Sequence, residues 1–148
     1  YASRCASLEP RFAAAVAWGA IWDYQETWRA RIARSFQTSL SVAGEHIAWV
    51  LGAADVQEAL AALAGYRLDG VVQQMRCPFL LLHGEHDEQV PLRDAQALLG
   101  AVGSADKTLR LFAGGRGGAT HCQNDALTLG TVAIADWLAD RLGKGARA

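Results

Sequence analysis

The chain has 148 residues, of which 51% are hydrophobic and 20% charged, and its formal net charge is -1. These proportions are typical of globular proteins and exclude the disordered, collagen-like and coiled-coil classes. Cationic side chains are scattered among acidic ones, and the apolar runs are far shorter than the roughly 20 residues of a membrane helix. We therefore expect no nucleic acid and no membrane as partner.

The cysteines are few and widely spaced, at Cys5, Cys77 and Cys122. No CxxC unit occurs, so neither a disulfide framework nor a zinc knuckle is indicated. We expect reduced thiols and a cytoplasmic location. The sequence begins at Tyr1 without the layout of a signal peptide, and we expect its natural start to lie upstream.

Residues 1–8 (YASRCASL) are rich in helix formers. Pro10 ends this predicted helix because proline disfavours a helical residue before it. Residues 13–18 (AAAVAW) form a short apolar run between Pro10 and Gly19, which predicts a strand buried on both faces.

Residues 24–66 are helical in period and carry Trp28, Phe36 and Trp49. Asp55 followed by Glu58 matches a capping box, after which apolar side chains recur on one face at Val56, Leu60 and Leu63. The expected helix breaks are Gly44, Gly52 and Gly65. We interpret 24–66 as a helical, lid-like insertion within a single domain that spans residues 1–148.

The rest of the chain alternates between helices and strands. Residues 69–75 predict one or two helical turns, and 79–83 (FLLLH) is the strongest strand, apolar enough to be central in a parallel sheet. Pro91 opens the next predicted helix, and 107–112 (KTLRLF) alternates like a strand. Residues 125–142 predict a final helix with four inward side chains, Ile134, Trp137, Leu138 and Leu142.

Strands separated by helices of this length predict an α/β fold with a mostly parallel sheet of about three strands and right-handed crossovers. Such a sheet is half of a normal doubly wound fold. Functional groups of these folds collect beyond the carboxyl ends of the strands. Here those ends correspond to the loops 19–23, 84–90 and 113–121.

Two of these loops carry an acid and a base in a useful order. Asp87 follows the strongest strand, and His121 follows the third strand after a glycine-rich loop in which Gly117 and Gly118 allow close approach. A carboxylate in this position can orient an imidazole and stabilise the imidazolium that forms when a nucleophile loses its proton. We therefore expect Asp87 and His121 to be the catalytic acid and base.

The motif HGEHDEQVP after one strand and GGATH after the next resembles the C-terminal half of the α/β-hydrolase superfamily. Within it, YASR, the Trp18-Gly19 strand end and the LDGV segment leading to Cys77-Pro78 are most similar to the dienelactone-hydrolase-like and pseudooxynicotine-hydrolase-like group. The resemblance implies the order nucleophile, acid, histidine, with the nucleophile serine on a G-x-S-x-G elbow. The sequence contains no such elbow, so the serine is expected upstream of Tyr1.

Several alternatives stay open for these residues. Asp87 alone could cap a helix or close a turn, and Asp23, just past the first strand, is a second candidate for the acid. Cys122 adjoins His121, but neighbouring residues usually point in different directions, so we expect a packed bystander thiol. His46, His83 and His86 are expected to be structural or solvated.

The substrate is expected to contact Trp18, Trp22 and Val90 beyond the strand ends. Trp18 and Trp22, with Trp28 and Trp49 of the insertion, could form an aromatic wall over a substrate. Ordinary core packing is the competing interpretation, since tryptophan mostly fills volume.

The resemblance implies a serine-type hydrolase or esterase that acts on a small molecule through an ester, lactone, amide or activated carbon–carbon bond. We expect no metal and no organic cofactor, because no His, Cys or carboxylate set has ligand spacing. The alternative is a catalytically inactive fragment or a hydrolase-fold binding module. In that case the half-sheet pairs with a missing N-terminal half or forms a homo-oligomer, most simply a dimer, because open sheet edges favour such pairing.

Overall fold

The structure is a computed structural model that describes residues 1–35 and 43–143. It divides into two compact units, one formed by Tyr1–Trp22 with Leu68–Ala148 and the other by Asp23–Arg67. The second unit corresponds closely to the predicted insertion at 24–66, of which residues 36–42 lie outside the described residues.

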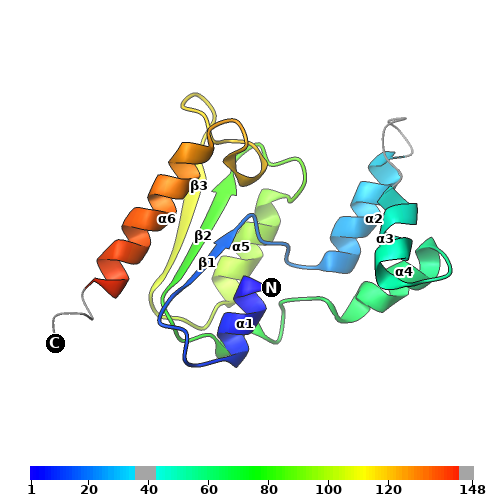
Figure 1. The fold of residues 1–148 in the computed structure, drawn as a ribbon, viewed down its shortest axis with the longest axis horizontal. Helices are drawn as coiled ribbons and strands as arrows, with labels where there is room; N and C mark the ends of the chain where they lie inside the picture. The colour runs from blue at the N-terminus through cyan, green and yellow to red at the C-terminus, as the bar shows by residue number, and fades with distance from the viewer. Residues whose placement is uncertain (36–42, 144–148) are drawn as a thin grey trace. The chain divides into compact units, whose positions relative to one another are not determined.

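The first unit contains a sheet of three parallel strands in the order β1-β2-β3 (Figure 1). The strands are β1 (Ala15–Trp18), β2 (Phe79–Gly84) and β3 (Lys107–Phe112). All three strand predictions are confirmed, the first beginning two residues late. Because the strands are parallel, their carboxyl ends lie at one edge of the sheet, as the fold class requires.

One face of the sheet is covered by α1 (Ala2–Leu8), the short helix η2 (Val72–Gln74) and α5 (Leu92–Ala101). The apolar side chains that fill this layer include Ala6, Val72, Met75, Phe79, Leu81, Ala95 and Leu98. Burial of a side chain of the size of leucine or phenylalanine stabilises the fold by about 1.5–3 kcal/mol. Pro91 precedes α5 as its N-cap and is therefore one residue outside the helix that it was predicted to open.

The opposite face is covered by α6 (Leu127–Leu142) (Figure 1). Ile134 and Trp137 of α6 pack against the layer formed by Leu80, Leu82, Phe112 and Ala133. The prediction that Leu142 points inward is wrong: its side chain is exposed, because it lies in the last turn of α6. The short helix η3 (His121–Gln123) lies in the connection between β3 and α6.

The second unit consists of α2 (Tyr24–Ser35), α3 (Ala43–Leu51), α4 (Val56–Ala62) and η1 (Leu63–Gly65). Its core is formed by Ile32, Ile47, Ala48, Ala59, Leu60 and Leu63. Asp55 caps α4 by accepting the Glu58 N–H at 2.8 Å, and the Glu58 carboxylate accepts the Ala54 N–H at 2.7 Å. The capping box is therefore confirmed, with the return bond one residue earlier than in the usual pattern.

The glycines of this unit differ in what they do. Gly52 follows α3 with a φ of +65°, a conformation that favours glycine and ends the helix. Gly44 was predicted to break a helix but lies in the first turn of α3, where its missing side chain leaves room for Val56.

Among the described residues, no single helix has the length and apolar character to cross a membrane. The bent pair Gly44–Leu51 and Val56–Gly65, which turns by 60°, satisfies length and composition only when the two helices are taken together.

Candidate active site

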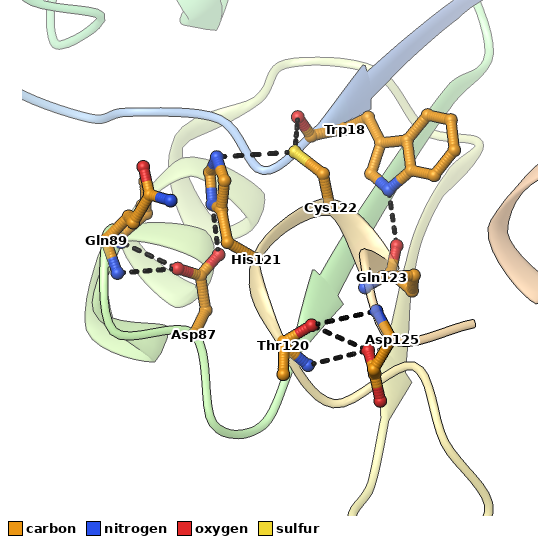
Figure 2. Close-up of polar contacts among 9 residues, drawn as sticks. Trp18, Asp87, Gln89, Thr120, His121, Cys122, Gln123 and Asp125 are labelled. Atoms are coloured by element: carbon orange, nitrogen blue, oxygen red, sulfur yellow. Dashed lines mark hydrogen bonds and ion pairs between the residues drawn. The ribbon is translucent and has the colours of Figure 1, made fainter. Parts of the chain in front are cut away.

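Asp87 lies in the loop after β2, with its side chain fully buried. Its Oδ1 accepts the backbone N–H groups of Gln89 at 2.8 Å and Val90 at 2.9 Å. These two bonds fix the plane of the carboxylate and leave Oδ2 directed away from its own loop (Figure 2). The local sequence therefore holds the acid without help from another element.

His121 begins η3 after β3, and its Nδ1 lies 2.8 Å from Asp87 Oδ2. A carboxylate can only accept a hydrogen bond, so Nδ1 carries the proton and donates it to Asp87. In the neutral imidazole, Nε2 is then the acceptor and points away from the carboxylate (Figure 2). The structure thus brings together the two residues that the sequence nominated, in the tautomer that a general base requires.

The approach of the two loops depends on a glycine. A Cβ on Gly84, at the end of β2, would overlap the carbonyl groups of Ala119 and Thr120. The loops are also joined through the backbone, because His86 N–H donates to Ala119 at 2.8 Å. Only a residue without a side chain at position 84 lets the His121 loop lie this close to the strand.

A second set of bonds closes the loop that carries His121. The Asp125 carboxylate accepts the Gly118 N–H at 2.7 Å. It also accepts the Thr120 hydroxyl at 2.6 Å (Figure 2). Its pKa is lowered, chiefly by the hydrogen bond from the Thr120 side chain. Gly117 and Gly118 have φ values of +79° and +83°, which explains the glycine-rich sequence before His121.

The expected substrate contacts lie in different environments. Trp18 packs against α6 at Gly130 and donates from Nε1 to Gln123 Oε1, so its ring belongs largely to the core (Figure 2). Trp22 is half-buried beside the other core layer, and its backbone N–H donates to Asp94 Oδ2 at 3.4 Å. Val90 is fully buried and meets Asp87 through its backbone. Substrate binding by Trp18, Trp22 and Val90 stays a prediction.

Asp23, the second candidate for the acid, has other partners. Its Oδ1 accepts the Glu26 N–H at 3.1 Å in the first turn of α2, and its Oδ2 lies 3.2 Å from Arg67 Nη2. These contacts are those of a helix cap with an ion pair. They favour Asp87 over Asp23 as the partner of a base.

The three remaining histidines were expected to be structural or solvated, and His83 differs from the other two in being deeply buried. His83 in β2 is only 1% exposed, and neither ring nitrogen has a hydrogen-bond partner within the described residues. Burial lowers its pKa, opposed in part by the negative charge of Asp87 and by a backbone contact with Val90 that is too long or too bent to be a full hydrogen bond. His86 is exposed beside Glu85, and His46 lies 6.1 Å from the Trp49 ring within the second unit.

Cys122 contradicts the sequence-based expectation. Its Sγ lies 3.4 Å from His121 Nε2 and 3.6 Å from the Trp18 carbonyl oxygen (Figure 2). The expectation that neighbouring side chains diverge fails because Cys122 has a left-handed backbone, with φ of +50°, which turns its side chain back beside the imidazole. No sequence signal marked this conformation, since glycine is the residue that usually adopts it.

In the described ranges 1–35 and 43–143, no three His, Cys, Asp or Glu side chains are grouped so as to hold a metal ion.

Comparisons with known proteins agree with this architecture. Residues 52–118 match the family described as serine aminopeptidase, S33. The chain is 32% identical over 146 residues to 2,6-dihydropseudooxynicotine hydrolase of Paenarthrobacter nicotinovorans, covering 98% of this chain and 36% of that protein. The chain thus spans about a third of the length of the curated relative that it matches.

Two solved structures have the same fold. The crystal structure of 2,6-dihydroxy-pseudo-oxynicotine hydrolase matches with a TM-score of 0.73 and 29% identity, over 98% of this chain and 38% of that one. An esterase from Pyrococcus furiosus matches with a TM-score of 0.65 and 12% identity, over 94% of this chain and 49% of that one. The resemblance to pseudooxynicotine-hydrolase-like proteins is confirmed, and the chain has the fold of part of an α/β-hydrolase.

Proposed function

We propose that the protein is a serine-type hydrolase of small molecules in which His121 is the general base and Asp87 the acid that orients it. The observation that carries this proposal is the 2.8 Å contact between His121 Nδ1 and Asp87 Oδ2 at the carboxyl edge of the sheet. The nucleophile is a serine on an elbow outside the printed residues, since no G-x-S-x-G occurs among them.

In the proposed reaction, each group has a defined role. The serine hydroxyl loses its proton to His121 Nε2 as its oxygen attacks the carbonyl carbon of the substrate. The imidazolium that forms keeps its Nδ1–H on Asp87, whose negative charge stabilises it. Nε2–H then returns the proton to the leaving group, and a water molecule repeats the cycle on the acyl-enzyme.

The substrate class is an ester, lactone, amide or activated carbon–carbon bond. The curated relative is named for the hydrolysis of 2,6-dihydropseudooxynicotine, and we include that compound among the proposed substrates. The acid–base pair supplies the proton transfers of the proposed reaction.

Substitution of either residue in the full-length protein tests the proposal. Asp87→Asn and His121→Ala are each expected to lower kcat on aryl esters by about 10³-fold or more, because the first imposes the wrong tautomer and the second removes the base. Glu88→Gln and His86→Ala change an exposed acid and an exposed histidine of the same loop and serve as matched controls. Wild-type rates in Asp87→Asn and His121→Ala would refute the assignment.

A non-catalytic binding or oligomerisation module is the second candidate, favoured by the open strand edges. Within the described residues, β1 and β3 each pair on one side only. An active-site-directed fluorophosphonate, followed by intact mass and size-exclusion chromatography of the full-length protein, separates the two functions. One labelled serine supports the hydrolase, whereas a dimer without any adduct supports the module.

We also propose a cytoplasmic location, since Cys5, Cys77 and Cys122 are free thiols in the structure. Cell fractionation with an antibody against the chain tests this, and recovery in an oxidising compartment would contradict it.

A further inference from the structure

Cys122 contacts the one atom of His121 on which the proposed mechanism depends. Asp87 can only accept, so the imidazole proton is on Nδ1 and Nε2 is an acceptor. The group that lies at this acceptor, 3.4 Å away, is the Cys122 sulfur. The thiol proton of Cys122 can therefore be donated to His121 Nε2, the nitrogen that receives the proton of the nucleophile in the proposed mechanism.

The surroundings of Cys122 favour a protonated thiol. Burial and the charge of Asp87 both raise its pKa, so at neutral pH the sulfur is a donor and a poor nucleophile. Two acceptors are within reach of its single proton, His121 Nε2 and, at 3.6 Å, the carbonyl oxygen of Trp18. A rotation about the Cβ–Sγ bond moves the S–H from one acceptor to the other.

Two features hold the contact between the Cys122 sulfur and His121 Nε2: the backbone conformation of Cys122 and the close approach of Gly19. The left-handed backbone of Cys122 is unusual for a residue other than glycine, and the next residue, Gln123, has a φ of +51° as well. Gly19 packs against the sulfur and the imidazole together, because a Cβ built there would lie 3.1 Å from Cys122 Sγ and 3.2 Å from His121 Cε1. The left-handed conformations of Cys122 and Gln123 cost energy, and such conformations persist where the surrounding structure imposes them.

We propose that Cys122 is a positioning residue for the general base. Its thiol donates to His121 Nε2, holds the imidazole plane, and turns to the Trp18 carbonyl when the serine hydroxyl donates to the same nitrogen. Cys122 is not itself the nucleophile. This inference rests on the proposed function, and it adds a residue that the acid–base pair does not include.

Substitutions at Cys122 in the full-length protein test the role of the S–H donor. Cys122→Ala is expected to lower kcat on aryl esters about fivefold, the effect of losing one weak hydrogen bond, and to leave KM within twofold. Cys122→Ser keeps a donor of similar size and is expected to restore kcat to within twofold of the wild type. An equal loss of kcat in both variants would show that Cys122 contributes only by packing, and it would overturn the inference. An unchanged kcat in Cys122→Ala would also overturn it.

A spectroscopic measurement reports on the contact without turnover. In protein labelled with ¹⁵N-histidine, the Nε2 resonance of neutral His121 is expected to move in Cys122→Ala and to return towards its wild-type position in Cys122→Ser. An Nε2 resonance that does not respond to Cys122→Ala would contradict the hydrogen bond. His121→Ala assigns the signal and also separates the two proposals: if His121→Ala retains activity, the proposed function fails, and if it is inactive while Cys122→Ala is normal, only the present inference fails.

Methyl methanethiosulfonate supplies an independent test. It transfers a methylthio group to the cysteine sulfur, which loses its proton as a sulfinate leaves, and so removes the S–H and places a methyl group beside Nε2. Treatment is expected to inactivate the wild type, Cys5→Ser and Cys77→Ser, and to spare Cys122→Ser. Cys77 is the matched control, because it is also partly buried with a pKa raised by burial. Full activity in protein shown by mass spectrometry to be modified at Cys122 would overturn the inference.

Discussion

At the scale of single residues, the position of His121 depends on two glycines. Gly84 lets the His121 loop approach β2, and Gly19 leaves space for the imidazole and the Cys122 sulfur. Both follow from the same physical fact, that a Cβ at these positions would occupy volume already filled by the site. Asp87 and His121 were candidates on the sequence alone, but the need for glycine at positions 19 and 84 became evident only in the structure.

Gly19→Ala is expected to lower kcat/KM on aryl esters more than tenfold, because the added Cβ pushes on the His121 ring while the φ of +68° strains the alanine. Gly70→Ala is the matched control. Its φ of +75° imposes similar strain, but nothing lies within 4 Å of the built Cβ. Both variants should lose about 1 kcal/mol of stability by denaturant unfolding, and only Gly19→Ala should lose activity. Equal kcat/KM values would contradict a role for Gly19 in placing the base.

His83 should make the stability of the protein depend on pH. Because burial lowers its pKa below the ordinary value of 6.5, the unfolded chain binds more protons than the folded one as the pH falls below 6.5. The free energy of unfolding is therefore highest above pH 6.5. It declines as the pH falls below 6.5, until the pH passes the folded-state pKa of His83. Urea unfolding between pH 5 and pH 8 measures this.

His83→Leu is expected to remove the decline and to raise the free energy of unfolding at neutral pH by about 1 kcal/mol, since two unpartnered buried nitrogens are eliminated. His86→Leu, at an exposed position, is the control and should leave the pH dependence in place. A decline of the same size in His83→Leu would assign the titration to another group.

At the scale of elements, the connection between β3 and α6 is shaped by one carboxylate. Asp125 bonds to the backbone and side chain ahead of it, at Gly118 and Thr120, and so closes the loop around His121. The sequence predicted β3 and α6 within two residues at each end. It did not predict the loop, because these bonds form between residues that have no periodic pattern.

Asp125→Ala is expected to lower kcat several-fold with little change in KM, because His121, the proposed base, is held less firmly. Asp136→Ala, an exposed acid on α6, is the control. Since the pKa of Asp125 is lowered, its contribution to stability is present above the ordinary value of 3.8 and is lost as the pH falls through its folded-state pKa. A wild-type acid unfolding curve in Asp125→Ala would contradict this contribution.

At the scale of the whole molecule, the chain leaves the first unit after Trp22 and returns at Leu68. The Leu68 N–H donates to the Trp22 carbonyl at 3.0 Å, so the two ends of the second unit are adjacent. Each unit has its own apolar core. The second unit is therefore packed separately from the first, over nearly the same residues as the helical segment predicted at 24–66.

Replacement of residues 24–66 in the full-length protein by a short Gly-Ser linker is expected to leave the first unit folded, since the linker needs only to join two adjacent backbone positions. Far-UV circular dichroism and a single cooperative thermal transition would measure this outcome. A variant with a two-residue longer linker controls for strain at the junction. Loss of cooperative unfolding in both variants would show that the first unit depends on the second.

The sequence alone determined the three strands, the helices that cover the sheet and the pair Asp87 and His121, because apolar periodicity and the order of loops after parallel strands are local properties. Only the tertiary structure decided which groups meet at His121 Nε2, that the buried ring of His83 makes no full hydrogen bond within residues 1–35 and 43–143, and that Leu142 is exposed. These outcomes depend on backbone conformations such as the positive φ of Cys122 and on contacts between distant segments, neither of which leaves a repeating pattern along the chain.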